Sequence, residues 1–388
     1  MRRVILILTI LAGIILAACS APKKWQGSPY VATGPAQVAN GSWDFSEFKP
    51  GIILPSAQKE VKVLLYTGKA ATISSNGYRF KYGASEKRGS GNFRPDRPGT
   101  YMPDDGRFTL GGKTYPGKLV ILRKGSRYQY INHVDETEYL ISVVSHEMSP
   151  SWPIEALKAQ AVVARTYLYQ RQKTAGNSVY EVDSTTNSQV YKGFAKGDQN
   201  VRKAVAESQG EVVTYKNELA QVFFYSCAGG FTAAASEVWS ADLPYLIAQK
   251  SEYCKGAPVY RWNTKFSKKE LETKLGIRNI RSISVSARTP SRRAHMIKIV
   301  TSNGTRTMRG TVFRSKMGAT RVKSTLFGIR MQNGKIAIAG KGFGHGVGMD
   351  QWGTKFLVEK HGKSYKDVIA HYFPGTRVDR KSAGWTPS

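Results

Sequence analysis

The carboxylate with the strongest chemical signal is Glu147, which lies at the end of an apolar helix face. Asp135 as N-cap and Glu138 three residues later have the spacing of a capping box, which predicts a helix from this point. The apolar stripe of that helix is formed by Leu140, Val143 and Val144. A glutamate that continues this stripe is partly desolvated, which raises its pKa and favours the protonated acid that donates to a leaving oxygen. The alternative is an exposed carboxylate at a helix end.

A second signal is the run of alternate glycines from Gly340 to Gly348, with His345 inside it and Gln351 just beyond. Alternate glycines permit the backbone to approach a sugar chain closely. The run is not a dinucleotide fingerprint, because it lacks the required strand–helix context. We predict His345 and Gln351 as substrate-binding residues, and His345 could also assist proton transfer. A structural histidine satisfied by the backbone is the alternative.

Ser226, Gly229 and Gly230 are further candidates for binding substrate, because hydroxyls and adjacent glycines could line the same groove. The alternative for this segment is a tight turn stapled by Cys227. Cys227 and Cys254 are the cysteines left if Cys19 is modified, and a disulfide is the default in an oxidising compartment.

A zinc site would need four ligands, and no histidine is near either of these cysteines in the sequence. We therefore predict no metal and no cofactor.

The N-terminus has the pattern of an export signal. Two arginines precede an apolar run of about 15 residues, which is too short to span a bilayer comfortably. The run ends in Leu16-Ala17-Ala18-Cys19, which resembles a bacterial lipobox with Cys19 as the lipidated residue. We expect an exported, membrane-anchored lipoprotein that faces the periplasm or the cell wall. An ordinary secretory signal with a coincidental cysteine is the alternative.

The charge of the chain indicates a polyanionic partner. The sequence has 58 lysines and arginines against 27 acidic residues, a net charge of +31. The basic residues are spread along the chain without the spacing of a nucleic-acid-binding motif, and an exported protein does not meet nucleic acid. We therefore expect affinity for the cell wall and no nucleic-acid partner.

Short strand-like runs surround the helical segment, which predicts an α+β fold with β-rich flanking modules. We expect the helical part to be the catalytic core, and the fold to have two lobes with a substrate cleft. An Asn333-Gly334 pair predicts a hairpin, and a last amphipathic helix is expected from about Asp350 to Lys360. The predicted divisions are a signal peptide (1–19), a flexible linker (20–58), a small β module (59–133), a catalytic helical and β region (134–256), a β-rich region (257–340), and a glycine-rich motif with C-terminal helices (341–378).

Four stretches in order resemble the signature of the stage II sporulation protein D family. The first runs from Val143 to Tyr167 and contains the Glu147-Met148 pair, and the second is Ser226-Cys227-Ala228-Gly229-Gly230-Phe231-Thr232 with Glu237-Val238-Trp239 and Pro244-Tyr245-Leu246 after it. The third is the glycine-rich stretch from Gly342 to Gly353, and the fourth is His371-Tyr372-Phe373-Pro374-Gly375-Thr376. The resemblance extends over residues 60 to 378.

This resemblance implies a peptidoglycan lytic transglycosylase that cleaves the β-1,4 bond between muramic acid and glucosamine, on strands lacking stem peptides, with Glu147 as its single acid/base. It also suggests a cleft position for Arg165, whose guanidinium would suit the lactyl carboxylate of muramic acid. A structural ion pair of Arg165 with Glu155 or a neighbour is the alternative. Some members of the family bind zinc in the segment that corresponds to Asp183 to Tyr191, but that segment has no Cys or His here.

Two other functions remain open from the sequence. One is a non-catalytic wall-binding amidase enhancer, with a cell-wall amidase as its partner, and the other is a lipoprotein that tethers the membrane to the wall. The presence of Glu147 within a matching motif favours the enzyme.

Overall fold

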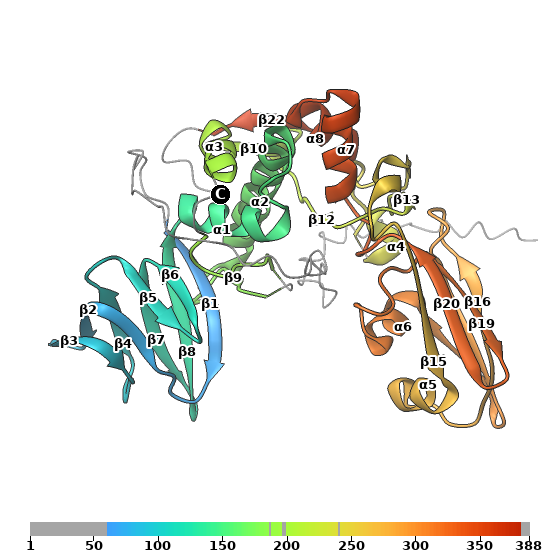
Figure 1. The fold of residues 1–388 in the computed structure, drawn as a ribbon, viewed down its shortest axis with the longest axis horizontal. Helices are drawn as coiled ribbons and strands as arrows, with labels where there is room; N and C mark the ends of the chain where they lie inside the picture. Colours follow the sequence, from blue (N-terminus) through green and yellow to red (C-terminus); the bar gives the residue numbers. More distant parts are fainter. Residues whose placement is uncertain (1–59, 186–187, 196–198, 240, 382–388) are drawn as a thin grey trace, which may run out of the picture.

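The computed structural model describes residues 60–185, 188–195, 199–239 and 241–381. The expected signal peptide, Cys19 and the whole of the expected linker therefore lie outside the described residues. The fold is α+β: a large curled sheet, a group of helices and a second β-rich region follow one another along the chain (Figure 1). Among the described residues, no helix combines the length and the apolar character needed to cross a membrane.

The first module is a nine-stranded sheet with the strand order β6-β5-β2-β4-β7-β8-β1-β9, in which β3 pairs with β2. Strand β1 pairs antiparallel with β8 and parallel with β9, which comes from beyond the first two helices. Its strands are β1 (Glu60–Gly68), β2 (Ile73–Tyr82), β3 (Ser85–Phe93), β4 (Gly99–Pro103), β5 (Arg107–Leu110), β6 (Lys113–Pro116), β7 (Lys118–Lys124), β8 (Arg127–Asp135) and β9 (Val182–Asp183).

The helices α1 (Glu136–Glu147) and α2 (Ile154–Ala175) follow directly from this sheet. Asp135 caps α1 by accepting a hydrogen bond from the Thr137 N–H at 2.8 Å, so the predicted helix start is confirmed. The reciprocal contact of a capping box is absent from the bonds described for this terminus, because the Glu138 carboxylate pairs with Arg202 at 3.1 Å. The turn between α1 and α2 contains Pro150 and Pro153, which end one helix and begin the next.

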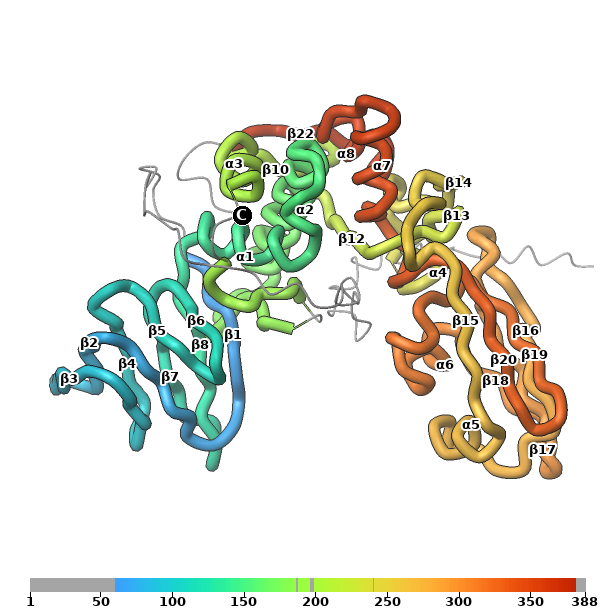
Figure 2. The backbone as a smooth tube through the Cα atoms, in the orientation of Figure 1, coloured from blue at the N-terminus to red at the C-terminus, as the bar shows by residue number. Residues whose placement is uncertain are grey.

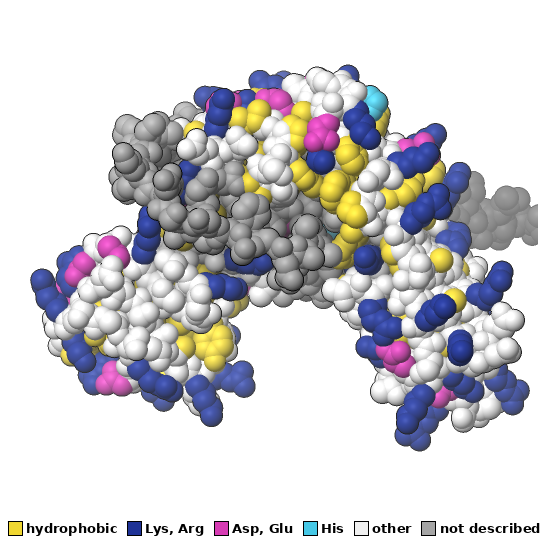
Figure 3. Space-filling model, viewed as in Figure 1, with side chains coloured by type: hydrophobic (Ala, Val, Ile, Leu, Met, Phe, Trp, Pro, Cys, Tyr) yellow, Lys and Arg dark blue, Asp and Glu magenta, His cyan; other side chains and the backbone are white. Residues whose placement is uncertain are grey.

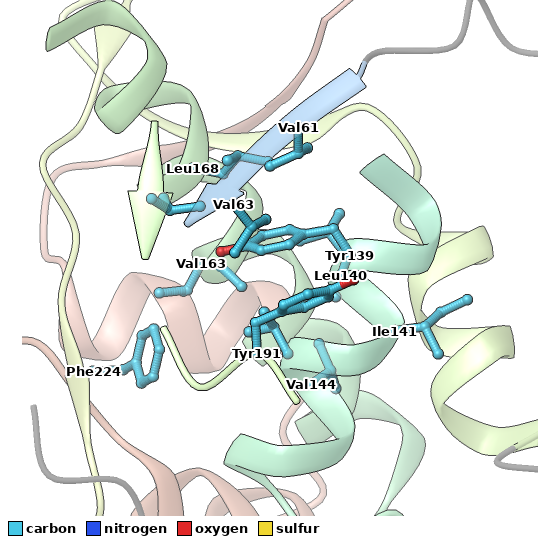
Figure 4. Packing of buried hydrophobic residues seen from close by; sticks show 14 of the residues in the cluster. Val61, Val63, Tyr139, Leu140, Ile141, Val144, Val163, Leu168, Tyr191 and Phe224 are labelled. Carbon is cyan, nitrogen blue, oxygen red and sulfur yellow. The ribbon is translucent and has the colours of Figure 1, made fainter. Parts of the chain in front are cut away.

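A single hydrophobic core joins the sheet to these helices (Figure 4). Val61 and Val63 of β1 pack with Leu140 of α1 and Val163 of α2, all of them almost completely buried. Large apolar side chains buried in this way contribute roughly 1.5–3 kcal/mol each. The core therefore fixes α1, and with it the position of Glu147, relative to the sheet.

The remaining helices and short strands complete the helical part of the molecule. The helices are α3 (Gln199–Glu207), α4 (Ala235–Val238), α7 (Gln351–His361) and α8 (Tyr365–Tyr372), with the 3-10 helix η1 (Tyr253–Gly256). The strands are β10 (Glu211–Tyr215), β11 (Glu218–Leu219), β12 (Phe224–Tyr225), β13 (Gly230–Phe231), β14 (Lys250–Ser251), β21 (Met349–Asp350) and β22 (Arg377–Arg380). The C-terminal helices lie close to the expected ranges, and α7 contacts α2. A disulfide joins Cys227 to Cys254, with their Cα atoms 5.9 Å apart.

Residues 261–341 form a second β-rich region with its own hydrophobic core, here called the basic module. It contains β15 (Arg261–Ser267), α5 (Lys268–Leu275), β16 (Ile280–Arg288), β17 (Ala294–Thr301), β18 (Gly304–Arg309), α6 (Gly310–Met317), β19 (Phe327–Gln332) and β20 (Lys335–Lys341). Strands β19 and β20 form the predicted hairpin, with Asn333 and Gly334 in the left-handed region (φ 49° and 67°), as the tight turn requires.

The basic residues are less evenly distributed than a first look at the sequence suggests. The basic module, residues 261–341, contains 20 lysines and arginines against two glutamates, a net charge of +18, which is more than half of the +31 of the whole chain. The chain trace in Figure 2 and the space-filling view in Figure 3 show this module on the side of the helices opposite the nine-stranded sheet.

Candidate active site

Glu147 is the last residue of α1, and its side chain is buried, with 4% of its surface exposed. Oε1 accepts a hydrogen bond from the Val190 N–H at 3.0 Å, and Oε2 accepts one from the Gln351 side-chain amide at 3.2 Å. The carboxyl group therefore brings together three segments that are far apart in the sequence. The first of them is the end of α1, and the others are the chain after β9 and the start of α7.

The electrostatic environment raises the pKa of Glu147. Burial is the main cause, because removing the carboxylate from water disfavours its charged form. The hydrogen bonds from Val190 and Gln351 and the positive charge of Lys192 act in the opposite direction and only partly offset it. A carboxylic acid with a raised pKa keeps its proton nearer to neutral pH, which suits a general acid.

The Val190 N–H is held in place by the neighbouring Tyr191. The Tyr191 ring stacks on the Tyr139 ring of α1 at 5.3 Å between centroids, and its hydroxyl donates to the Asn132 side chain at 2.7 Å. Figure 4 shows both rings in the core beneath α1. Neither Val190 nor Lys192 was predicted from the sequence, because a backbone donor carries no signal in residue type.

Gln351 is positioned by the residue before it, Asp350, which is the N-cap of α7. The Asp350 carboxylate accepts hydrogen bonds from the Gly353 N–H and, across the chain, from the Ala228 N–H, both at 2.9 Å. Burial raises the pKa of Asp350 to about 7, although three backbone N–H groups oppose the shift. Asp350 thus ties the segment from Ser226 to Ala228 to the start of the helix that presents Gln351.

Ser226 lies in this tied segment, Gly229 and Gly230 follow it directly, and the three residues have different surroundings. Ser226 is completely buried, and its carbonyl accepts from the Trp352 N–H at 3.0 Å. Gly229 (φ 71°) packs so closely on Lys341 and Gly342 that a Cβ would lie 2.6 Å from backbone atoms. Gly229 and Gly230 also line a surface groove of about 720 Å³ that they form together with the basic module.

The glycines from Gly342 to Gly348 pack closely against protein, which gives the run a structural explanation beside the predicted approach to a sugar chain. Gly348 (φ 80°) is the plainest case, since a Cβ there would lie 2.2 Å from the Phe223 carbonyl oxygen. Parallel pairing of β12 with β21 and the bridge between Cys227 and Phe343 produce this close contact. These glycines therefore allow the close packing that places Gln351 next to Glu147.

His345 fits the alternative interpretation, a structural histidine satisfied by the backbone. Nε2 donates to the Phe224 carbonyl at 3.1 Å, and Nδ1 accepts from the Val347 N–H at 3.1 Å. Burial, with the charge of Arg314, lowers the pKa of His345 to about 3, so the ring is neutral. Both ring nitrogens are occupied, which leaves neither available to a substrate in this arrangement.

Arg165 also occupies a structural position. It is 1% exposed, and Nη1 donates to the carbonyls of Ser208 and Glu211 at 2.7 and 3.0 Å. Nε pairs with Glu136 at 3.3 Å, so the ion pair involves this residue instead of Glu155. Glu136 and Glu147 lie at opposite ends of α1, about 16 Å apart along the helix. These contacts favour the alternative, a structural ion pair, over the cleft position that the resemblance suggests for Arg165.

Two tryptophans that follow Glu147 and Gln351 in the sequence contact each other in the structure. Trp152 follows Glu147 by five residues and Trp352 follows Gln351 directly, and their rings are 4.8 Å apart. The Lys355 ammonium lies over both rings. Both side chains are half-buried, and the sequence signal that could have identified them is their place inside the two motifs that carry Glu147 and Gln351.

We expect the loss of the Gln351 amide to alter the pH dependence of any reaction that uses Glu147 as an acid. Because this amide stabilises the ionised carboxylate, Gln351→Leu raises the pKa of Glu147 further, and the alkaline limb of the pH–rate profile moves to higher pH. The rate at the optimum falls about fivefold, the effect of losing a hydrogen bond worth about 1 kcal/mol. A pH–rate profile whose alkaline limb moved to lower pH, or not at all, would contradict the assignment of the acid.

The fold and this geometry define an α+β protein with one candidate acid/base residue, Glu147. This residue is buried where the end of α1 meets the start of α7, just after the glycine-rich stretch. Comparisons with known proteins agree with this class. Residues 124–215 match the family model described as stage II sporulation protein, and residues 203–348 match one described as a domain of unknown function.

Three relatives span most of the chain. Stage II sporulation protein D of Bacillus subtilis is 32% identical over 288 residues, covering 70% of this chain and 81% of the relative. An uncharacterized protein of Brachyspira hyodysenteriae is 36% identical over 277 residues, covering 70% and 74%. The amidase enhancer of Bacillus subtilis is 32% identical over 343 residues, covering 74% of this chain and 47% of the relative. The chain belongs to the stage II sporulation protein D family.

Proposed function

We propose that this chain is a peptidoglycan lytic transglycosylase that cleaves the β-1,4 bond between N-acetylmuramic acid and N-acetylglucosamine. The observation that carries the proposal is the buried Glu147, whose pKa is raised by burial and whose two oxygens are fixed by Val190 and Gln351. The family membership supports a function in the cell wall.

In the first step, protonated Glu147 gives its proton to the glycosidic oxygen, and the bond from that oxygen to C1 of muramic acid breaks. In the second step, the C6 hydroxyl of the same sugar attacks C1, and the Glu147 carboxylate accepts the hydroxyl proton. The product has a 1,6-anhydro ring, and Glu147 ends the cycle protonated. The Val190 and Gln351 donors stabilise the ionised carboxylate between the two steps.

A single carboxylate is sufficient for this reaction, whereas ordinary glycosidases use two. Asp350 is close to Gln351 in sequence, but its carboxylate is completely buried and occupied by backbone N–H groups. It is therefore unsuited to act as a nucleophile or to activate water. This supports intramolecular attack by the C6 hydroxyl over hydrolysis.

The glycan strand is proposed to enter between the nine-stranded sheet and the basic module, which stand apart below the helices (Figures 1 and 3). Two lobes around a substrate cleft would then place Trp152, five residues after the acid, and Trp352, directly after its amide partner, where a sugar ring can pack. Strands without stem peptides are the proposed substrate.

Product analysis distinguishes this function from the second candidate function, a non-catalytic amidase enhancer. The purified chain is incubated with glycan strands that have or lack stem peptides, and the products are identified by mass spectrometry. Anhydro-muramic ends support the proposal, whereas reducing ends indicate hydrolysis by water. No cleavage, together with a higher rate of a cell-wall amidase, would favour the second candidate, a wall-binding amidase enhancer, as the name of one relative suggests.

We further propose that the mature chain is a lipoprotein anchored through Cys19 and facing the periplasm or cell wall. The support is the apolar run that ends in Leu16-Ala17-Ala18-Cys19. Labelling cells with a fatty-acid analogue should mark the wild-type chain and leave Cys19→Ser unmarked. Equal labelling of the two would overturn the anchor.

A further inference from the structure

The groove that the basic module forms with neighbouring segments is lined by positive charge and by small residues. The small residues include Gly328 of β19 and Ala339 and Gly340 of β20, and the Trp262 ring lies against Gly340. The charged lining of the groove consists of Arg261, Arg288, Arg292 and Lys341, and among the described residues that line it Glu252 is the one acidic residue. Glu252 forms an ion pair with Lys250 at 3.6 Å, and Lys250 is not one of the four lining cations. Among the described lining residues, the four cations therefore have no acidic partner of their own.

The two arginines on one wall are held in place before any ligand arrives. The Arg288 guanidinium donates to the carbonyls of Arg292 and Phe327 at 2.8 and 3.0 Å. Arg292 has a left-handed backbone (φ 63°), which is unusual for a residue other than glycine, and its guanidinium lies 4.7 Å from the Phe231 ring centroid. Such pre-organised cations lose little conformational entropy on binding an anion.

Lys341 and Tyr260 add a further cation and an aromatic ring to the lining of the groove. The Lys341 ammonium lies 5.9 Å from the Tyr260 ring centroid. Buried Arg293, next to Arg292, donates to the carbonyls of Ala228 and Phe231 at 3.2 and 3.0 Å. Ala228 in turn donates its N–H to Asp350, and the next residue, Gln351, donates to Glu147, so hydrogen bonds connect the groove to the candidate active site. Glu147 itself does not line the groove.

We propose that this groove binds the short stem peptides of uncleaved peptidoglycan through their carboxylates. This proposal depends on the proposed function in one respect, which is that the cell wall is the environment of the chain. Arginine forms paired hydrogen bonds with carboxylates, and a groove of about 720 Å³ has the size of sites that hold a small ligand or a short peptide.

The number of cations distinguishes the peptide from bare glycan. A strand stripped of peptides offers one carboxylate per disaccharide, whereas a stem peptide brings several carboxylates within a few bonds of one another. Four cations around one groove match the second arrangement. The groove thus anchors the protein on intact wall while the Glu147 site acts on an adjacent stripped strand.

The test is a binding titration of the full chain with three soluble probes: a disaccharide-peptide with free carboxylates, the same compound with amidated carboxylates, and a peptide-free disaccharide oligomer. We expect the first probe to bind at least about tenfold more tightly than the other two, with an affinity that falls as salt rises. Equal binding of the amidated or the peptide-free probe would overturn the proposal.

Matched variants separate the groove from the general charge of the module. Arg261→Gln/Arg292→Asn/Lys341→Gln should weaken binding of the first probe at least about tenfold, and asparagine tolerates the left-handed backbone at 292. The control Lys269→Gln/Arg306→Gln/Lys316→Gln removes three exposed cations outside the groove and should bind like wild type. Equal losses in both triple variants would show attraction by diffuse charge only, which also overturns the proposal.

Two further measurements distinguish a failure of the groove proposal from a failure of the proposed catalysis and from misfolding of the variant. Glu147→Gln should bind the first probe like wild type, and the groove variant should still cleave soluble peptide-free glycan at the wild-type rate. If the triple variant unfolds early in a thermal scan, Arg292→Asn alone is used, with an expected loss of at least about threefold in affinity. Wild-type affinity of a folded Arg292→Asn variant would count against the groove.

Discussion

Glu147→Gln is expected to slow formation of anhydro-muramic products by about 10²- to 10⁴-fold, the usual contribution of a general acid. The amide cannot donate a proton to the glycosidic oxygen or accept one from the C6 hydroxyl. The geometry of the site survives, because the new carbonyl oxygen can accept from the Val190 N–H, and a rotated Gln351 amide can offer its own oxygen to the new NH₂ group.

The stability of this variant provides an independent check. Burial raises the pKa of Glu147 in the folded chain above its unfolded value, so its ionisation costs folding free energy. Stability that wild type has at low pH is therefore lost as pH rises through the interval between the two pKa values. Glutamine does not titrate, so Glu147→Gln should become more stable than wild type as pH rises, as measured by urea unfolding at several pH values.

The matched control is Glu138→Gln on the same helix. Glu138 pairs with Arg202 and lies outside the candidate site, so this variant should keep wild-type activity with a change in stability of about 1 kcal/mol or less. Retained activity in Glu147→Gln, or an equal loss in Glu138→Gln, would refute Glu147 as the acid.

The local parts of this site could be predicted from the sequence because they depend on short-range patterns. The N-cap at Asp135, the apolar stripe and the prolines after Glu147 define where α1 begins and ends. The Asn333-Gly334 turn is specified by its own two residues. In each case the interaction that determines the structure connects residues within a few positions of one another.

What could not be predicted depends on contacts between distant segments. Arg165, His345 and the glycine run have residue types that suit both substrate and protein, and their partners are carbonyls or backbone atoms tens of residues away. A backbone carbonyl has no sequence signature, so these structural roles were not distinguishable from binding roles. The Val190 N–H that holds Glu147 was missed for the same reason.

The charge of the basic module illustrates a different limit. Counting residues along the chain gives the total charge, but a groove forms only when β15, β19 and β20 pair into a sheet and the turn before Arg293 folds over its edge. Sequence therefore indicated an anionic partner, whereas the arrangement of four cations around one groove suggests a particular kind of anion.

The second large effect is expected for Arg165→Met, which should lower the free energy of unfolding by about 3–5 kcal/mol without changing KM for glycan. Arg165 satisfies the carbonyls of Ser208 and Glu211 and pairs with Glu136. Methionine fills much of the volume but leaves the partly buried Glu136 carboxylate without its cation. Removing one partner of a buried pair is strongly destabilising for this reason.

Urea unfolding measures this loss, and assays of the folded fraction at low temperature measure kcat and KM. Lys173→Met is the control on the same helix, since Lys173 is exposed and lies 3.9 Å from Glu218, so its loss should change stability by less than about 1 kcal/mol. A stable Arg165→Met variant with a raised KM would return Arg165 to the substrate cleft. Destabilisation with an unchanged KM means that Arg165 contributes to function only by holding α1, α2 and the end of α3 together, and so by keeping Glu147 in place.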